Sequence, residues 1–496
     1  MNRRRQPDRS FLPARRSVFF LCSFFLCSLG LAPAGFAQTL IFEHATVIDA
    51  TGALPKKNFT VVVRDGRIAS VTPHAENAPE AEPGARVIDA TGKYLTPGLW
   101  DMHVHITAPE IVFPLLLANG ITGVREMYSG NSLATVRQWK QLPDAPRMYA
   151  PGFIDGPLMT VKQPDSFAVS NAEQARIAVR FLKAEGADFL KVYNSVPRDA
   201  FFALADEARA VGITIAGHVP EEVSPIEASD QGMRSEEHLN NLLLGASTNE
   251  TQLREERVAM MYSQQITGEQ RLRLLAWPML AGLVDTYDQK KADAMFRVFV
   301  KNGTRQTPTL AILWGFVHEL DDEFVNDPRL RFVPKTWSVN WNPRVIFYLR
   351  DESPAEYQAL HERMRMLLTR YHKLVGDMNR AGVELLAGTD MNPFNPVLPG
   401  WGLHQELVLL CESGLTPMQA LQTATRNPAR YFGILNETGT IEAGKSADLV
   451  LLDADPLADI QNTQKIDAVV SRGRYYSRRD LDAMLERTAA LSATVH

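Results

Sequence analysis

The feature that most constrains the fold is the alternation of short apolar segments with longer helical patterns through residues 96–432. This alternation is typical of βαβ units arranged around a parallel sheet. Eight short segments are candidate strands, at residues 100–105, 123–126, 147–150, 189–193, 214–218, 234–238, 306–309 and 385–390. The stretch from Leu242 to about Arg380 is rich in charged helical residues, so we expect helices and loops there beyond the minimal repeat. Its tryptophans belong either to a lid over the functional site or to surface helices: Trp314, Trp337 and Trp341.

Histidines and an aspartate stand at the ends of several candidate strands. His103 and His105 are separated by one residue on an extended segment, so their side chains point to the same side. In a barrel of parallel strands, the carboxyl ends of all strands converge on one face, where active sites lie. This face would also receive His218, His238 and Asp390. Each residue alone is more often structural, but their joint placement predicts a metal site.

Both ends of the chain are rich in short β segments broken by glycine turns. Candidate strands lie at residues 46–49, 60–63, 68–71 and 86–89, and again at 448–453 and 468–471. This pattern predicts a small β-sandwich domain that is assembled from residues 38–95 and 433–480, with a middle domain at residues 96–432 between them in the sequence.

Residues 1–37 have the layout of a secretory signal peptide. An arginine-rich start precedes an apolar run from Val18 to Leu31, and the small residues Gly35 and Ala37 follow. We therefore expect an exported protein, periplasmic or secreted. An uncleaved membrane anchor is the disfavoured alternative, because the apolar run is short for a span. The pair Arg15-Arg16 leaves both general and twin-arginine export open.

Charge and cysteine content narrow the class of partner. Loss of residues 1–37 removes six arginines and one aspartate, a net charge of +5, so the formal charge changes from −5 to −10. An acidic protein argues against nucleic acid or an anionic membrane as partner, which leaves a small-molecule substrate. Self-association into a homo-oligomer stays open. Cys22 and Cys27 lie in the removed segment, so only Cys411 remains and no internal disulfide can form.

Several motifs resemble those of the amidohydrolase superfamily, and most of all its imidazolonepropionase-like and prolidase-like branch. They are Asp101-Met-His-Val-His105, Gly120-Ile-Thr-Gly-Val-Arg125, Phe189-Leu-Lys-Val-Tyr193, Ala216-Gly-His218, Glu237-His238, Ala387-Gly-Thr-Asp390 and the segment from Gly439 to Val450. The resemblance covers essentially the whole chain after residue 37. It implies a distorted (β/α)8 TIM barrel that carries the small β-sandwich. One departure is Glu126, where relatives usually have aspartate; it lies outside the ligand set.

The resemblance also implies a binuclear centre with two divalent metal ions. Nitrogen and oxygen ligands of this kind suit Zn²⁺, and they leave manganese, cobalt and nickel open. The more buried ion would be bound by His103, His105 and Asp390, and the second ion by His218 and His238.

Lys191 has two interpretations. A lysine in a strand is either a partnered cation of the barrel interior or a modified ligand. The resemblance implies the second, in which the amine captures carbon dioxide and the resulting carbamate bridges the two metals. A hydroxide held between the metals would attack the substrate carbonyl, with Asp390 as general base and then general acid.

The expected reaction is hydrolysis of an amide bond, in a dipeptide or an N-acyl amino acid. A lactone, an ester or a cyclic amide suits the same metals, and a non-catalytic exported binding protein is the alternative from another class. Tyr193 and Arg125 are candidate substrate binders, with a core tyrosine and a structural ion pair as their alternatives. His404 follows a proline-rich loop at residues 393–399 and is a third candidate for substrate contact.

The segment from Gly439 to Ser446 matches the phosphate-binding pattern G-x-x-x-x-G-K-[ST]. Such a loop follows a buried strand and opens a helix, whose amino end holds phosphate. Here a strand-like segment at 448–452 follows instead. We therefore predict a turn and no nucleotide site.

Overall fold

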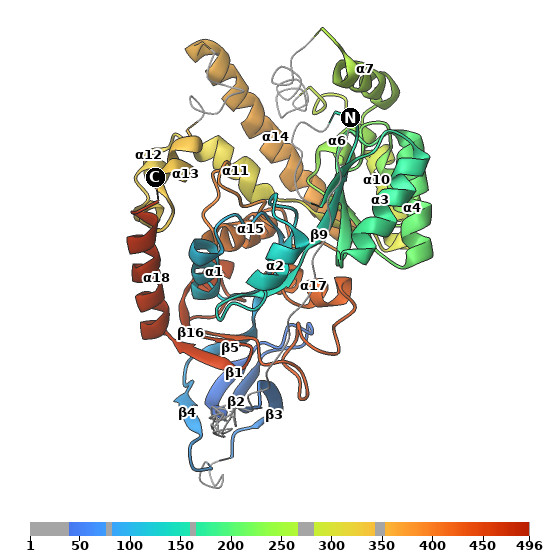
Figure 1. Ribbon diagram of the computed structural model, residues 1–496. Coiled ribbons are helices and arrows are strands. Elements are labelled where there is room, and N and C mark those ends of the chain that lie inside the picture. Colours follow the sequence, from blue (N-terminus) through green and yellow to red (C-terminus); the bar gives the residue numbers. More distant parts are fainter. Residues whose placement is uncertain (1–38, 76–81, 159–164, 266–281, 343–352, 496) are drawn as a thin grey trace, which may run out of the picture. The chain divides into compact units, whose positions relative to one another are not determined.

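The computed structural model describes residues 39–75, 82–158, 165–265, 282–342 and 353–495 (Figure 1). The described residues belong to one compact unit. Residues 1–37, the predicted signal segment, lie outside the described residues. None of the helices that the structure describes is long and apolar enough to cross a membrane.

Strands from both ends of the chain pair in one eight-stranded sheet. Its members are β1 (Leu40–Val47), β2 (Lys56–Arg64), β3 (Arg67–Pro73), β4 (Arg86–Asp89), β5 (Tyr94–Pro97), β15 (Leu449–Leu452), β16 (Ile466–Ser471) and β17 (Arg474–Ser477). β5 joins the two ends because it pairs with β1 on one side and with β15 on the other. The strand order is β17-β16-β15-β5-β1-β2-β3, with β4 beside β1. The two ends thus meet as predicted, but as one mixed sheet; a two-sheet sandwich is not recorded among the described residues.

The middle of the chain is built from parallel strands in two sheets. The first has the order β6-β7-β8 and the second the order β10-β9-β11-β12-β13-β14. The strands are β6 (Leu99–Val104), β7 (Ile121–Glu126), β8 (Arg147–Tyr149), β9 (Pro151–Asp155), β10 (Ser166–Ala168), β11 (Phe189–Val192), β12 (Ile215–Gly217), β13 (Met233–Glu237) and β14 (Arg305–Thr307). Every residue of β6, β7 and β11 is buried. Such continuous burial is typical of parallel strands covered on both faces.

Helices follow the strands and cover the sheets (Figure 1). Those up to residue 302 are α1 (Pro109–Ala118), α2 (Leu133–Trp139), α3 (Ala172–Ala184), α4 (Arg198–Val211), α5 (Pro225–Asp230), α6 (Asn240–Gly245), α7 (Glu250–Tyr262) and α10 (Gln289–Asn302). The later ones are α11 (Leu310–His318), α12 (Asp322–Val325), η1 (Pro328–Phe332), α13 (Lys335–Asn340), α14 (Pro354–Ala381), α15 (Trp401–Glu412), α16 (Pro417–Thr423), α17 (Arg426–Tyr431), η2 (Ile460–Gln464) and α18 (Arg478–Ser492). Several of them lie between residues 242 and 380, so the expectation of extra helices there is confirmed.

Residues 385–390, the predicted eighth strand, do not form a regular strand. Leu385 makes an isolated parallel bridge with Gln306 of β14, and Met391 makes one with Val104 of β6. Gly388 permits the close approach, because a Cβ at this position would lie 2.9 Å from the backbone nitrogen of His103. The segment therefore runs between β14 and β6. The α/β class with parallel strands is confirmed, while a single closed sheet of eight regular strands is not recorded among the described residues.

Candidate metal centre

The structure brings five of the predicted ligands into one cluster. The Nε2 atoms of His105 and His103 lie 3.0 Å and 3.5 Å from the same oxygen, Oδ1 of Asp390. The Nε2 atoms of His218 and His238 lie 3.1 Å apart. The rings of His103 and His238, with centroids 4.9 Å apart, join the two groups. The convergence of strand ends, which the sequence predicted, therefore assembles these side chains.

Two of the imidazoles are oriented by oxygens that only accept hydrogen bonds. The Nδ1–H of His105 donates to the backbone carbonyl oxygen of Tyr128 at 2.7 Å. The Nδ1–H of His218 donates to the side-chain oxygen of Asn194 at 2.6 Å. Because Nδ1 carries the proton, Nε2 of each neutral ring has a lone pair. These lone pairs face Asp390 and His238, an arrangement that a shared cation would satisfy.

Glu237 orients His103 in the same way. Its Oε2 accepts a hydrogen bond from Nδ1 of His103 at 2.9 Å, and its Oε1 accepts from Arg125 and from Ser235, each at 2.6 Å. All four residues are buried. The Nε2 of His103 has no hydrogen-bond partner in the described part of the chain. A buried lone pair without a partner is costly, so this atom fits a bound cation.

Arg125 forms a structural ion pair, which is the alternative to substrate binding that the sequence left open. Its side chain is fully buried, and each guanidinium nitrogen donates a hydrogen bond within the protein. The acceptors are the carbonyl oxygen of Met102 and the side chains of Ser235, Glu237 and Thr307. The structure therefore does not support a substrate contact for Arg125, because this guanidinium is occupied by the pair with Glu237.

Four residues around the cluster have a left-handed backbone although none is glycine. The φ angles are 64° at His238, 55° at Asp390, 84° at Tyr128 and 51° at Thr309. Thr309 also places its hydroxyl 2.6 Å from Nδ1 of His238. Such conformations are unfavourable, most of all for a β-branched residue, and they concentrate at functional sites that fix the backbone.

Lys191 lies in the same interior on β11. Its side chain is 1% exposed, and its Nζ lies 5.9 Å from the centre of the Tyr193 ring. Gly217 makes room for it, since a Cβ there would lie 3.0 Å from Cδ of Lys191. Burial lowers the pKa of Lys191 to about 8, against the opposing charges of Glu237 and Asp390. A neutral amine is therefore accessible near neutral pH.

The protonation of the cluster follows from burial and from the charges inside it. Burial lowers the pKa of His103, His218 and His238, and the charge of Lys191 acts in the same direction. At His105, burial also opposes the charged form, but the hydrogen bond with Asp390 and the negative charges of Asp390 and Glu126 together outweigh it and raise the pKa. Protonation is therefore favoured at His105, beside Asp390, over the other three rings.

Asp101 joins the two segments that carry the first group of ligands. Its Oδ2 accepts a hydrogen bond from the Thr389 hydroxyl at 2.7 Å, and its Oδ1 accepts from the backbone nitrogens of Thr389 and His103. This buried carboxylate therefore fixes residue 390 relative to β6.

The two remaining substrate candidates lie in different places. Tyr193 is half-buried beside the cluster, with its ring centre 4.2 Å from that of His218. His404 is fully buried elsewhere, with its nitrogens 2.9 Å from the hydroxyl of Thr463 and 3.1 Å from the carbonyl oxygen of Asn119. Both of its nitrogens are committed to the core, so the structure does not support the predicted substrate contact of His404.

The segment at residues 439–446 has the turn conformation predicted for it. The ammonium of Lys445 lies 2.6 Å from Oε2 of Glu442 and 2.5 Å from the hydroxyl of Thr440. The next element is β15, a strand. Because a phosphate loop opens a helix and keeps its lysine for the phosphate, the rejection of a nucleotide site is supported.

Comparisons with known proteins identify relatives of parts of this chain. The profile of the Amidohydrolase family matches residues 365–475. An imidazolonepropionase of Mesorhizobium japonicum is 40% identical over 81 residues, which are 16% of this chain and 20% of that protein. A dihydroorotase of Anaeromyxobacter dehalogenans is 28% identical over 185 residues, 35% of this chain and 36% of that protein. The chain thus matches well under half the length of these curated relatives.

Similarity to solved structures extends over most of the chain. A bottromycin amidohydrolase has 25% identity and a TM-score of 0.67, over 92% of this chain and 90% of that chain. A Xaa-Pro dipeptidase with bound methionine in its active site has 18% identity and a TM-score of 0.60, over 89% of this chain and all of that chain. These similarities indicate a TIM-barrel-like α/β fold.

Proposed function

We propose that this chain, which belongs to the amidohydrolase superfamily, is a metal-dependent hydrolase of carbon–nitrogen bonds. One observation carries the proposal: imidazole nitrogens with lone pairs converge with the carboxylate of Asp390 where the parallel strands end. Nδ1 of three of these rings is held by an acceptor, which leaves Nε2 for a metal.

The donor set fits two divalent metal ions. The ligand atoms of His103, His105 and Asp390 all lie within 4.8 Å of one another, so one ion would be held there. A second ion would be held by His218 and His238. Imidazole and carboxylate ligands suit Zn²⁺.

Lys191 would complete this centre as a carbamate. Its neutral amine adds to carbon dioxide and releases one proton, and the product is an anion with two oxygen donors. The Lys191 side chain, which would otherwise be a cation when protonated, thus becomes an anion that can bind a metal. The lowered pKa of Lys191 and the space left by Gly217 both support this proposal.

The residues of the chain divide the remaining chemistry between them. When bound, divalent metals ionise water and polarise a carbonyl group. Asp390 is a carboxylate at neutral pH: burial raises its pKa, but the hydrogen bond with His105 and the positive charges of His238, His105 and Lys191 together outweigh burial and lower it. Its Oδ1 would accept a proton from water and return it to the leaving nitrogen. The phenol of Tyr193, beside His218, would orient the carbonyl or carboxylate of the substrate.

The proposed substrate is a dipeptide or an N-acyl amino acid. The likeness to a Xaa-Pro dipeptidase and to an amidohydrolase supports an amide bond. The test is a screen of metal-loaded protein with both substrate classes, beside the Asp390→Asn variant. Loss of the base should lower turnover at least about a hundredfold while the protein stays folded. Near-normal turnover of this variant with its metals in place would overturn the role of Asp390.

Two further parts of the proposal concern architecture and location. The bridges of residues 385 and 391 to β14 and β6 support a distorted (β/α)8 barrel that closes through this segment. Export to the periplasm or medium, with removal of residues 1–37, is supported by the sequence of that segment. Mass spectrometry of the mature protein tests it, since an intact N-terminus in the exported protein would contradict cleavage.

A further inference from the structure

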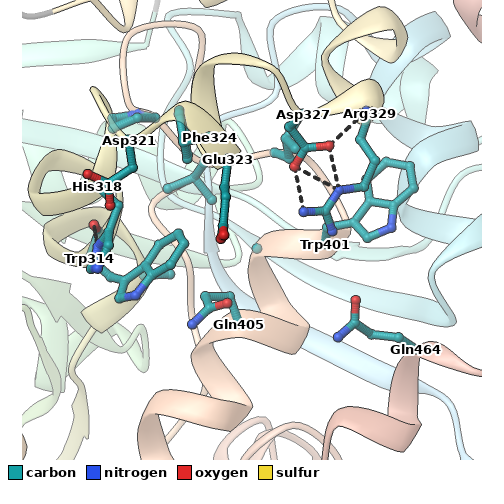
Figure 2. Close-up of a pocket in the computed structure, with 15 residues that line it drawn as sticks. Trp314, His318, Asp321, Glu323, Phe324, Asp327, Arg329, Trp401, Gln405 and Gln464 are labelled. Atoms are coloured by element: carbon teal, nitrogen blue, oxygen red, sulfur yellow. Dashed lines mark hydrogen bonds and ion pairs between the residues drawn. The ribbon is translucent and has the colours of Figure 1, made fainter.

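A cavity of about 380 Å³ shares no residue with the candidate metal centre (Figure 2). It lies between α11, α12, η1, residues 396–398 and the start of α15. Its volume falls within the range of small-molecule sites. The described chain therefore offers a second place where a ligand of modest size fits.

The walls of this cavity are held closely together by two glycines. A Cβ at Gly315 of α11 would lie 2.3 Å from the carbonyl oxygen of Pro396. A Cβ at Gly402 of α15 would lie 2.3 Å from the side chain of Val397. Larger residues at these positions would push the elements apart, so the cavity has well-packed walls.

Aromatic side chains form much of its lining. Trp314, Phe324 and Trp401 face the cavity, and each is half-buried. The rings of Trp314 and Phe324 lie 6.5 Å apart, and Trp314 stacks on His318 at 4.3 Å. Trp401 stacks on Phe332 at 5.4 Å and has the guanidinium of Arg329 5.9 Å from its ring centre, which shows that this ring already accepts a cation. Aromatic faces attract cations, and they do so best when the cation carries apolar groups and is weakly hydrated.

The charged residues of the lining are predominantly acidic. Asp327 is neutralised by Arg329, to which it is bound through both carboxylate oxygens. For Asp321 and Glu323 no ion pair is recorded within the described ranges. Figure 2 shows the carboxylate of Glu323 directed toward Gln405, with Trp314 and Trp401 on either side. The lining thus has two carboxylates whose charge a ligand could balance.

We propose that this cavity binds an organic ammonium ion with apolar substituents, such as a quaternary amine. An anion would be repelled by Asp321 and Glu323, which have no recorded ion pair in the described part of the chain, and a neutral apolar ligand would gain nothing from their charge. A bare metal ion does not fit, because His103, His105 and Asp390 form the only group of three close ligands among the described residues. The proposal is independent of the activity of the metal centre.

The test compares choline with 3,3-dimethylbutan-1-ol, which has the same shape but carbon in place of the charged nitrogen. Neither has a basic nitrogen that could bind a metal, so a difference in their affinities, measured by calorimetry on the full metal-loaded protein, reports the effect of the positive charge. One choline per chain is expected, with the alcohol bound at least about tenfold more weakly. Equal affinities, or no heat of binding at about 10 mM choline, would overturn the proposal.

Variants locate the site. Glu323 is exposed, so Glu323→Gln should fold normally and bind choline at least about fivefold more weakly. Trp314→Ala should weaken choline by about tenfold. The matched control is Asp322→Asn, because Asp322 lies between Asp321 and Glu323 on the chain but outside the cavity lining. Unchanged affinity in both Glu323→Gln and Trp314→Ala, or an equal loss in the control, would place choline elsewhere and overturn the assignment.

Discussion

The Nδ1 of His103 lies 2.9 Å from Oε2 of Glu237, and neither side chain is exposed to solvent. This hydrogen bond fixes the ring so that Nε2 points toward Asp390. Glu237 is itself held by Arg125 and Ser235. Glu237 and its partners therefore orient the proposed metal ligand His103, and they do so without binding the metal themselves.

Glu237→Gln should lower metal affinity by about 10- to 100-fold, because an amide holds the imidazole less strongly than a carboxylate. Chelator competition measures this affinity. Glu236→Gln is the matched control: Glu236 is equally buried, but it accepts a hydrogen bond from Gln306 and does not contact a ligand. Equal effects of the two substitutions would show that Glu237 has no particular role in positioning His103.

Lys191→Ala should lose metal and activity together, and short carboxylic acids should partly restore both. The reason is that a carboxylate can replace the bridging oxygens of a carbamate, whereas it cannot replace an interior cation. Protein prepared with ¹³C-bicarbonate should show a carbamate resonance that Lys191→Ala lacks. A free amine at Lys191 in the fully active protein would rule out the bridge.

Much of the site could be predicted because ligands at strand ends follow local rules. Period-two alternation places His103 and His105 on one side, and the strand pattern predicts where His218 and His238 stand. The partners of these rings could not be predicted. Tyr128 contributes only a backbone oxygen, which leaves no trace in the side-chain sequence. Asn194 and Thr309 follow strands, as many polar residues do, so their position does not mark them as partners of a histidine. The one partner that the sequence indicated was Glu237, because it directly precedes His238.

The expectations that the structure does not support have the same origin in long-range pairing. From the sequence alone, an arginine within a strand, such as Arg125 in β7, looks the same whether it binds substrate or pairs with an interior carboxylate such as Glu237. Two β-rich ends predict a shared domain, but only the pairing of β5 with both β1 and β15 shows one mixed sheet. Residues 385–390 are apolar enough for a strand, yet the left-handed φ of Asp390 interrupts the regular pattern.

Metal affinity should fall as the pH falls. His105 has a raised pKa, so it is the first imidazole of the cluster to be protonated on acidification. Its proton occupies the place between His105 and Asp390 that a metal would take, and metal binding must displace it. Below the pKa of His105, the dissociation constant should rise by about tenfold for each pH unit and each displaced proton. Titration with Zn²⁺ between pH 8 and pH 6 measures it; a constant affinity would contradict this linkage.

His404→Ala should affect stability and not the metal. Both nitrogens of His404 have hydrogen-bond partners in the core, so the substitution removes these bonds and leaves buried partners unsatisfied. The free energy of unfolding should fall by about 1–3 kcal/mol, as measured by denaturant titration. Metal content and substrate preference of the folded variant should be unchanged. An altered substrate preference at full metal content would restore His404 as a substrate residue.

The most direct test of the account is the metal content of active protein, measured by elemental analysis after exhaustive purification. About two divalent metal ions per chain are expected, as in two-metal hydrolases. Chelation should abolish hydrolysis, and added Zn²⁺ should restore it. Full activity in protein with less than about one metal ion for every ten chains would contradict metal-dependent hydrolysis at this site.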